Sequence, residues 1–172
     1  MDGKILSSQK GKKGFTLIEL LIVIMLLGFL SIMGFSLFQG SQKRSRDIRR
    51  KTDLRQVAKA LEMYANDYGY PLAESEKIKG CGTPTTTPPA ITACSWGSIW
   101  NVTIGTTPVV YMQKLPTDPG SGSYCYQMIG SGYKLFAILE SDDADKISLP
   151  VSCNGQTIYN YVLRSSNLLP TQ

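Results

Sequence analysis

Four cysteines, a group of aspartates and one glutamate inside an apolar run are the side chains of this 172-residue chain whose types and spacing could do chemistry. The chain has no histidine. That excludes mechanisms built on an imidazole base or on histidine-ligated zinc. Only 112 residues follow residue 60, which leaves little room for a deep catalytic cleft. The sequence therefore predicts a protein that is not an enzyme.

The cysteines, Cys81, Cys94, Cys125 and Cys153, favour disulfides over a zinc site. Structural zinc sites use close pairs such as C-x2-C, and no such pair is present. Four cysteines allow three pairings. We prefer Cys81 with Cys94 and Cys125 with Cys153, because each bridge then stays local to one subregion, although the sequence leaves the other pairings open. Disulfides indicate an oxidising compartment.

The glutamate, Glu19, is the only charge among the 24 residues from Phe15 to Phe38. As a helix these residues span about 36 Å, enough to cross the roughly 30 Å of bilayer hydrocarbon. A carboxylate at mid-bilayer costs about 2.5 to 3.5 kcal/mol, so it needs a partner. In a bundle of parallel helices, the obvious partner is the amino group that would appear if the chain were cut before Phe15.

The apolar run is predicted to continue as an amphipathic helix to Tyr68, with Gly40-Ser41 as the place to bend and Gly69 and Pro71 as the stop. Apolar residues recur there at helical spacing, at Leu54, Val57, Ala58, Leu61, Tyr64, Ala65 and Tyr68. A helix this long without a partner helix in its own chain implies association through the helix.

Positive charge is concentrated in the first part of the chain. Residues 1–60 hold 12 Lys or Arg against 4 Asp or Glu, while the whole chain carries +5. The basic run Lys43–Lys51 could attract anionic lipid or nucleic acid. We prefer a solvated face, or charges answered by Asp47, Asp53 and a neighbouring subunit's acids, because no aromatic residue is interleaved for base stacking.

From Ala73 onward the sequence predicts an irregular loop followed by short strands. Residues Gly80–Pro89 are too rich in Pro, Gly and Thr for a helix or a central strand. Strands are predicted at Ser123–Met128, Lys134–Glu140 and Thr157–Leu163, the first two joined as a hairpin by Gly130-Ser131-Gly132. A small antiparallel sheet packed on the helix would bury the apolar stripe, which gives an α+β fold.

The segment Lys13-Gly14-Phe15-Thr16-Leu17-Ile18-Glu19, followed by Leu20-Leu21-Ile22-Val23-Ile24, resembles the N-terminal processing signature of type IV pilins and of the pseudopilins of type II secretion. The resemblance implies that a prepilin peptidase, which requires Gly14, cuts between Gly14 and Phe15 and methylates the new amino group. It also implies that Glu19 pairs with a neighbour's terminus, and that an inner-membrane assembly platform builds a homo-oligomeric filament. Loss of four lysines and one aspartate would lower the net charge from +5 to +2.

The resemblance divides the chain into a leader at 1–14, a transmembrane or filament-core helix at 15–38, a helix extension at 39–70 and an extracytoplasmic α+β head at 71–172, the pilin fold. More positive charges follow the apolar run than precede it, which by itself would place the head in the cytoplasm. We overrule that count because the signature fixes the leader inside and the cysteines suit an oxidising compartment. The precursor is thus expected in the inner membrane and the product in a surface filament.

Calcium is a further implication of the resemblance. Leu115-Pro116-Thr117-Asp118-Pro119-Gly120 and the tyrosine-rich residues after it are similar to the region of major pseudopilins that holds a calcium ion. Carboxylates of the right kind for calcium follow, at Asp118, Asp142, Asp143 and Asp145. The aspartate cluster lacks the glycines that shape the family's loop, so we prefer a chain without a cofactor.

The function favoured by the sequence is a structural subunit of a type IV pilus-like filament, with the Thr/Pro loop and four cysteines as the features that favour a pilus. The first alternative is a pseudopilin of type II secretion, supported by the Leu115–Pro119 segment. The second is a DNA-capturing subunit of a competence filament, motivated by the basic run. A plain anchored extracellular module would never expose Phe15 as a free N-terminus.

Overall fold

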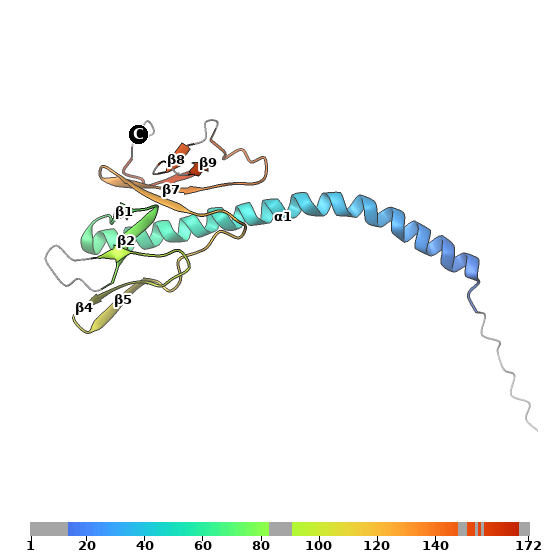
Figure 1. Ribbon diagram of the computed structural model, residues 1–172, viewed down its shortest axis with the longest axis horizontal. Coiled ribbons are helices and arrows are strands. Elements are labelled where there is room, and N and C mark those ends of the chain that lie inside the picture. The colour runs from blue at the N-terminus through green and yellow to red at the C-terminus, as the bar shows by residue number, and fades with distance from the viewer. Residues whose placement is uncertain (1–13, 83–90, 148–150, 154, 156, 169–172) are drawn as a thin grey trace, which may run out of the picture. The chain divides into compact units, whose positions relative to one another are not determined.

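The computed structural model describes residues 14–82, 91–147, 151–153, 155 and 157–168. Within these ranges the chain forms one α-helix and ten β-strands, all paired antiparallel, and the predicted α+β fold is confirmed (Figure 1). The chain divides into two compact units, one up to Gly40 and one from Ser41 onward. The predicted leader, up to Lys13, and residues 83–90 of the Thr/Pro loop lie outside the described residues.

The helix α1 covers the 52 residues Leu17–Tyr68, close to the predicted range. Its end follows from Gly69, which has a φ of 79° that disfavours other residues. The Gly69 amide donates to the carbonyl of Ala65 at 2.9 Å, and this bond closes the last turn. The predicted stop is therefore where the helix ends.

Residues 15–38 were expected to cross a membrane as the first part of this helix. In the part of the chain that the structure describes, no helix combines the length and the apolar character that a membrane crossing requires.

A three-stranded sheet follows α1 where the sequence analysis expected an irregular loop, so that expectation was wrong. Its strands are β1 (Leu72–Glu74), β2 (Lys77–Cys81) and β3 (Thr92–Ala93). The turn between β1 and β2 places Ser75 and Glu76 at φ values of 49° and 68°. Two-residue hairpin turns with positive φ are usually made by Asn or Gly, so this turn carries no recognisable sequence signal.

The predicted hairpin is confirmed in a second three-stranded sheet, of order β10-β7-β6. Its strands are β6 (Cys125–Ile129), β7 (Gly132–Ala137) and β10 (Tyr161–Arg164). The third predicted strand, Thr157–Leu163, is divided at Asn160 into β9 (Thr157–Tyr159) and β10. Asn160 uses its side chain to accept from the amide of Leu139 at 2.6 Å and to donate to the Leu139 carbonyl at 2.9 Å. These bonds replace strand pairing at that position.

Two hairpins complete the head. β4 (Trp100–Ile104) pairs with β5 (Thr107–Met112), and β8 (Val151–Cys153) pairs with β9. In Figure 1, β7, β8 and β9 lie on one side of the second part of α1, and β4 and β5 on the other.

The core of the head forms on the predicted stripe of α1. Leu54, Val57 and Leu61 are fully buried, whereas Tyr68 at the helix end is 39% exposed. The surrounding core is rich in aromatic residues, with Trp100, Tyr111, Tyr124, Tyr126 and Tyr133 in the same cluster as the helix residues. Buried tyrosines need hydrogen-bond partners, and several find them on α1: Tyr124 donates to Asp53 at 2.8 Å, and Tyr111 to Asp67 at 2.6 Å. The second part of α1 is thus the platform on which the head is built.

Candidate functional site

The N-terminal end of α1 is a closed hydrogen-bonded cap. The amide of Glu19 donates to the Thr16 hydroxyl at 3.3 Å, and Glu19 Oε2 accepts from the Thr16 amide and hydroxyl, each at 2.8 Å. This is a capping box, in which two side chains satisfy amide groups that the first helical turn leaves unpaired. Glu19 therefore has a role within its own chain.

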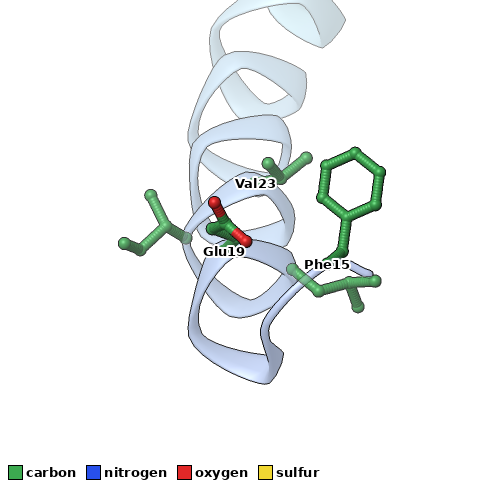
Figure 2. Close-up of a pocket in the computed structure, with 5 residues that line it drawn as sticks. Phe15, Glu19 and Val23 are labelled. Atoms are coloured by element: carbon green, nitrogen blue, oxygen red, sulfur yellow. The ribbon is translucent and has the colours of Figure 1, made fainter. Parts of the chain in front are cut away.

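The Glu19 carboxylate retains capacity for another partner. Both bonds from Thr16 end on Oε2, so Oε1 can accept from a group outside this turn. A shallow apolar hollow beside the carboxylate is lined by Phe15, Glu19, Leu20, Ile22 and Val23 (Figure 2). A cation that reached Glu19 here would be held in apolar surroundings, where ion pairs are stronger than in water.

Apolar side chains surround this end of the helix and lack cover from the described residues. Every large apolar residue from Phe15 to Ile32 is at least 50% exposed, and Phe15 and Leu17 reach 90%. Exposed apolar surfaces of this size mark sites of association with protein or lipid. The arrangement can bind a neighbouring helix laterally and a cation at its end.

The basic run, in the second unit, is divided between two faces of α1. Arg46, Arg50 and Lys51 turn toward the head, where each pairs with acidic residues of the same chain. Lys43, Arg44 and Arg49 are exposed on the outer side. The basic run was expected to be a solvated face, or to be answered by Asp47, Asp53 and acids of a neighbouring subunit. Asp47 does pair with Arg50, and the other acids that pair with the inward residues belong to the same chain.

Arg50 is the centre of a buried ionic junction between helix and head. Its side chain donates to Asp118 through Nε at 2.6 Å and Nη2 at 2.8 Å, to Asp47 at 2.8 Å and to Glu140 at 2.7 Å. The side chains of Arg50, Asp47 and Asp118 are 3%, 1% and 1% exposed, so these charges depend on one another. The hydrogen bonds that Arg50 donates to Asp118 raise the pKa of Arg50 and outweigh burial, which alone would lower it.

Asp47 links the junction to the segment after β7. It accepts from the amides of Glu140 and Ser141 and from the Ser141 hydroxyl. Burial disfavours its charged form, but these bonds and Arg50 outweigh that cost, so its pKa lies below its ordinary value. Arg46 lowers the pKa of Glu140 to about 2, with a second contribution from Arg50.

Lys51 holds the aspartate cluster for which calcium was considered. Its ammonium donates to Asp143 at 2.8 Å and to Asp145 at 2.7 Å. Asp118 belongs instead to the Arg50 junction. Among the described residues, no three carboxylate or cysteine side chains are grouped closely enough to hold a metal ion.

The four cysteines form the two disulfides that the sequence analysis preferred. Cys81 and Cys94 have Cα atoms 5.2 Å apart, and Cys125 and Cys153 have Cα atoms 6.4 Å apart. The first bridge joins β2 to the residue after β3, and the second joins β6 to β8. Cys94, Cys125 and Cys153 are buried, so the bridges are part of the packing of the head.

Two features of the site were missed from the sequence. The sequence contains the signal for the capping box, because Thr16 and Glu19 have the S/T-x-x-E spacing just before an apolar run. The sequence contains no comparable signal for the Arg50 junction, since Asp118 and Glu140 lie 68 and 90 residues further along the chain. The i, i+3 spacing of Asp47 and Arg50 is the only local sign of it.

Comparison with known proteins gives a short motif and a set of distant relatives. Residues 9–37 match the family model described as the prokaryotic N-terminal methylation motif. The type II secretion system core protein G of Pseudomonas aeruginosa is 27% identical over 124 residues, which cover 72% of this chain and 78% of the relative. The type II secretion system core protein G of Aeromonas hydrophila is 26% identical over 125 residues, which cover 72% of this chain and 77% of the relative. No solved structure gives a significant match.

These matches support the family of type IV pilins and type II secretion pseudopilins, as the N-terminal signature predicted. The relatives carry the name of a secretion protein, so they favour the first alternative of the sequence analysis, the pseudopilin, over its main choice of a type IV pilus subunit.

Proposed function

We propose that this chain, as a member of the pilin and pseudopilin family, is a structural subunit of a type II secretion pseudopilus. The subunits assemble through the apolar part of α1, and the heads cover the filament. The observation that carries assembly through the helix is the exposed apolar surface from Phe15 to Ile32, whose single carboxylate lies at its start.

The proposed order of events begins with a precursor in the inner membrane. Prepilin peptidase removes residues 1–14 and methylates the amino group of Phe15. During assembly, Oε1 of Glu19 accepts from the terminal ammonium of a neighbouring subunit, while Oε2 keeps its bonds to Thr16. Burial of the apolar side chains against neighbouring helices then stabilises the filament, at about 25 cal/mol per Å² of apolar surface covered.

The choice between secretion and pilus rests on the relatives, whose matched regions cover 72% of this chain and so extend beyond the N-terminal motif. Deletion of the gene in its own organism is expected to lower the export of folded proteins to the medium and leave surface pili in place, with export restored by the intact gene. Normal export together with loss of surface pili would reverse the assignment.

Processing and assembly can be tested separately. Mass analysis of the mature protein is expected to find N-methyl-Phe15 as the first residue, and an intact leader would overturn the proposal. Glu19→Ala is expected to leave cleavage intact and abolish filaments. The control is Glu74→Ala, which removes a carboxylate that is 51% exposed on β1 of the head and should leave filaments unchanged.

Capture of DNA is retained as a second candidate because of the outer basic face. Lys43, Arg44 and Arg49 are exposed there, and Arg55 and Lys59 extend the face by three turns. Contacts of such residues with phosphates would make binding strongly dependent on salt. Fluorescence anisotropy with labelled duplex DNA and the full chain in detergent micelles should show affinity that falls steeply between 50 and 200 mM salt. Absence of salt-sensitive binding would eliminate this candidate.

A further inference from the structure

The family resemblance implies a calcium ion in the region that begins at Leu115, with Asp118 and the aspartates of the segment after β7 as candidate ligands. Here Ser141–Asp145 follows Glu140 and contains the three aspartates of the cluster. Calcium takes six to eight oxygen ligands at about 2.3–2.6 Å, so carboxylate oxygens must be free to turn toward it. The hydrogen bonds of the aspartate side chains show which carboxylate oxygens already have partners within the chain.

Three of the four candidate carboxylates, those of Asp118, Asp143 and Asp145, already have partners. Asp118 accepts from Arg50 on both oxygens, and its Oδ1 also accepts from the amides of Gly120 at 2.8 Å and Gly122 at 3.3 Å. Asp143 accepts from the Asp145 amide on Oδ1 at 2.9 Å and from Lys51 on Oδ2. These residues therefore do not fit a calcium ion.

The Lys51 ammonium occupies the point where Asp143 and Asp145 converge. Its side chain is 14% exposed, and Nζ also lies 5.6 Å from the centroid of the Tyr161 ring on β10, a favourable position for a cation. A divalent ion placed between the same two carboxylates would be repelled by the ammonium at short range. Lysine and calcium are thus alternatives at this position.

We propose that Lys51 serves as a built-in cation that replaces calcium, so that the segment after β7 closes on the helix without any metal. One positive charge suffices because the segment has other anchors. Asp47 holds the amides of Glu140 and Ser141, and the amide of Ile147 donates to the carbonyl of Asn160 at 2.9 Å. Lys51 fixes the part between these two anchors. This inference rests on the head alone and does not depend on which filament the chain builds.

The test uses the full chain in detergent micelles, with Lys51→Gln and the matched variant Lys59→Gln. Lys59 is on the same helix and exposed, so both variants remove one positive charge. Only Lys51→Gln removes the ion pairs with Asp143 and Asp145. Thermal unfolding is measured with excess EDTA and with millimolar calcium chloride. Hydrogen exchange by mass spectrometry reports on peptides that cover residues 138–147.

The wild-type protein is expected to show the same Tm, within 1 °C, with EDTA and with calcium. Lys51→Gln is expected to lower the Tm and to increase exchange at least tenfold in residues 141–147, while Lys59→Gln matches the wild type. A wild-type Tm that calcium raises by several degrees and EDTA restores would overturn the proposal. Equal exchange in the two variants would overturn it as well, because Lys51 would then not hold the segment.

Discussion

The two parts of α1 differ in how their side chains are satisfied. From Ser41 onward, the inward residues have partners within the chain: Leu54 and Leu61 are fully buried, and Arg50 is surrounded by three carboxylates. From Leu17 to Ile32 the large apolar side chains are half exposed or more. One helix thus combines a segment that completes a fold with a segment that the described chain leaves uncovered.

The difference separates stability from assembly. Residues of the second part contribute to the free energy of unfolding of the head, whereas residues of the first part contribute only where another molecule covers them. Substitutions of the same kind in the two parts should therefore change different measurements.

The largest effect is expected at Arg50. Arg50→Met removes the shared cation and leaves Asp47 and Asp118 buried without it, which should lower the free energy of unfolding by about 3 to 5 kcal/mol. The measurement is denaturant unfolding of the full chain in detergent, followed by the fluorescence of Trp96 and Trp100. The control is Arg49→Met on the exposed side of the same helix, for which the change should stay within about 0.5 kcal/mol. Similar losses in both variants would mean that the junction contributes nothing specific.

A pair of leucines tests the comparison directly. Leu61→Ala creates a cavity in the core and should cost about 2 to 5 kcal/mol of unfolding free energy. Leu27 is 58% exposed, so Leu27→Ala should change unfolding of the monomer by less than about 0.5 kcal/mol and weaken filament assembly instead. Filaments are counted by electron microscopy. A Leu27 variant that destabilises the head as much as the Leu61 variant would contradict the separation.

Acid should destabilise the junction. The pKa of Glu140 is lowered to about 2 by Arg46 and Arg50, and the pKa values of Asp47 and Asp118 are also lowered. Because its pKa is lowered on folding, the Glu140 carboxylate stabilises the head fully above pH 4.5, its ordinary pKa. That contribution is lost as the pH falls toward 2. A wholly buried group with the shift of Glu140 would lose about 3 kcal/mol, and its partial exposure reduces this to about 1 to 2 kcal/mol.

The measurement for this prediction is denaturant unfolding at intervals between pH 6 and pH 2. Arg50→Met should lose less stability than the wild type over that interval, because Asp118 no longer has its cation. The same acid dependence in both proteins would show that other carboxylates are responsible.

The sequence was sufficient where the signal is local. The stripe from Leu54 to Tyr64, the stop at Gly69 and the hairpin around Gly130 all depend on residues a few positions apart, and the structure has them where they were expected. The two disulfides also follow the preference for local pairs. Periodicity and turn chemistry are properties of short windows, so they can be read without knowledge of the fold.

The sequence was insufficient where the signal depends on distant residues. Nothing near Arg50 in the chain indicates Asp118 or Glu140, and nothing near Asp143 indicates Lys51. The basic run was therefore expected to be a solvated face, or to be answered by Asp47, Asp53 and a neighbouring subunit, although the helical period turns some of its members inward and others outward. The sheet from β1 to β3 was missed because its first turn uses Ser75 and Glu76 in a conformation that their residue types seldom adopt.

The smallest effect is expected at the cap of α1. Thr16→Val removes the hydroxyl that accepts from the Glu19 amide and donates to its carboxylate, while the Thr16 amide can still bind Glu19. The loss should be about 1 kcal/mol and confined to the first turn, seen as faster hydrogen exchange near Leu20, with unfolding of the head unchanged. Filaments should persist, since the Glu19 oxygen proposed to bind a neighbour's terminus is not the one that Thr16 uses. If Thr16→Val abolished filaments as completely as Glu19→Ala, the cap itself would be required for assembly, and the two oxygens of Glu19 could not be assigned separate roles.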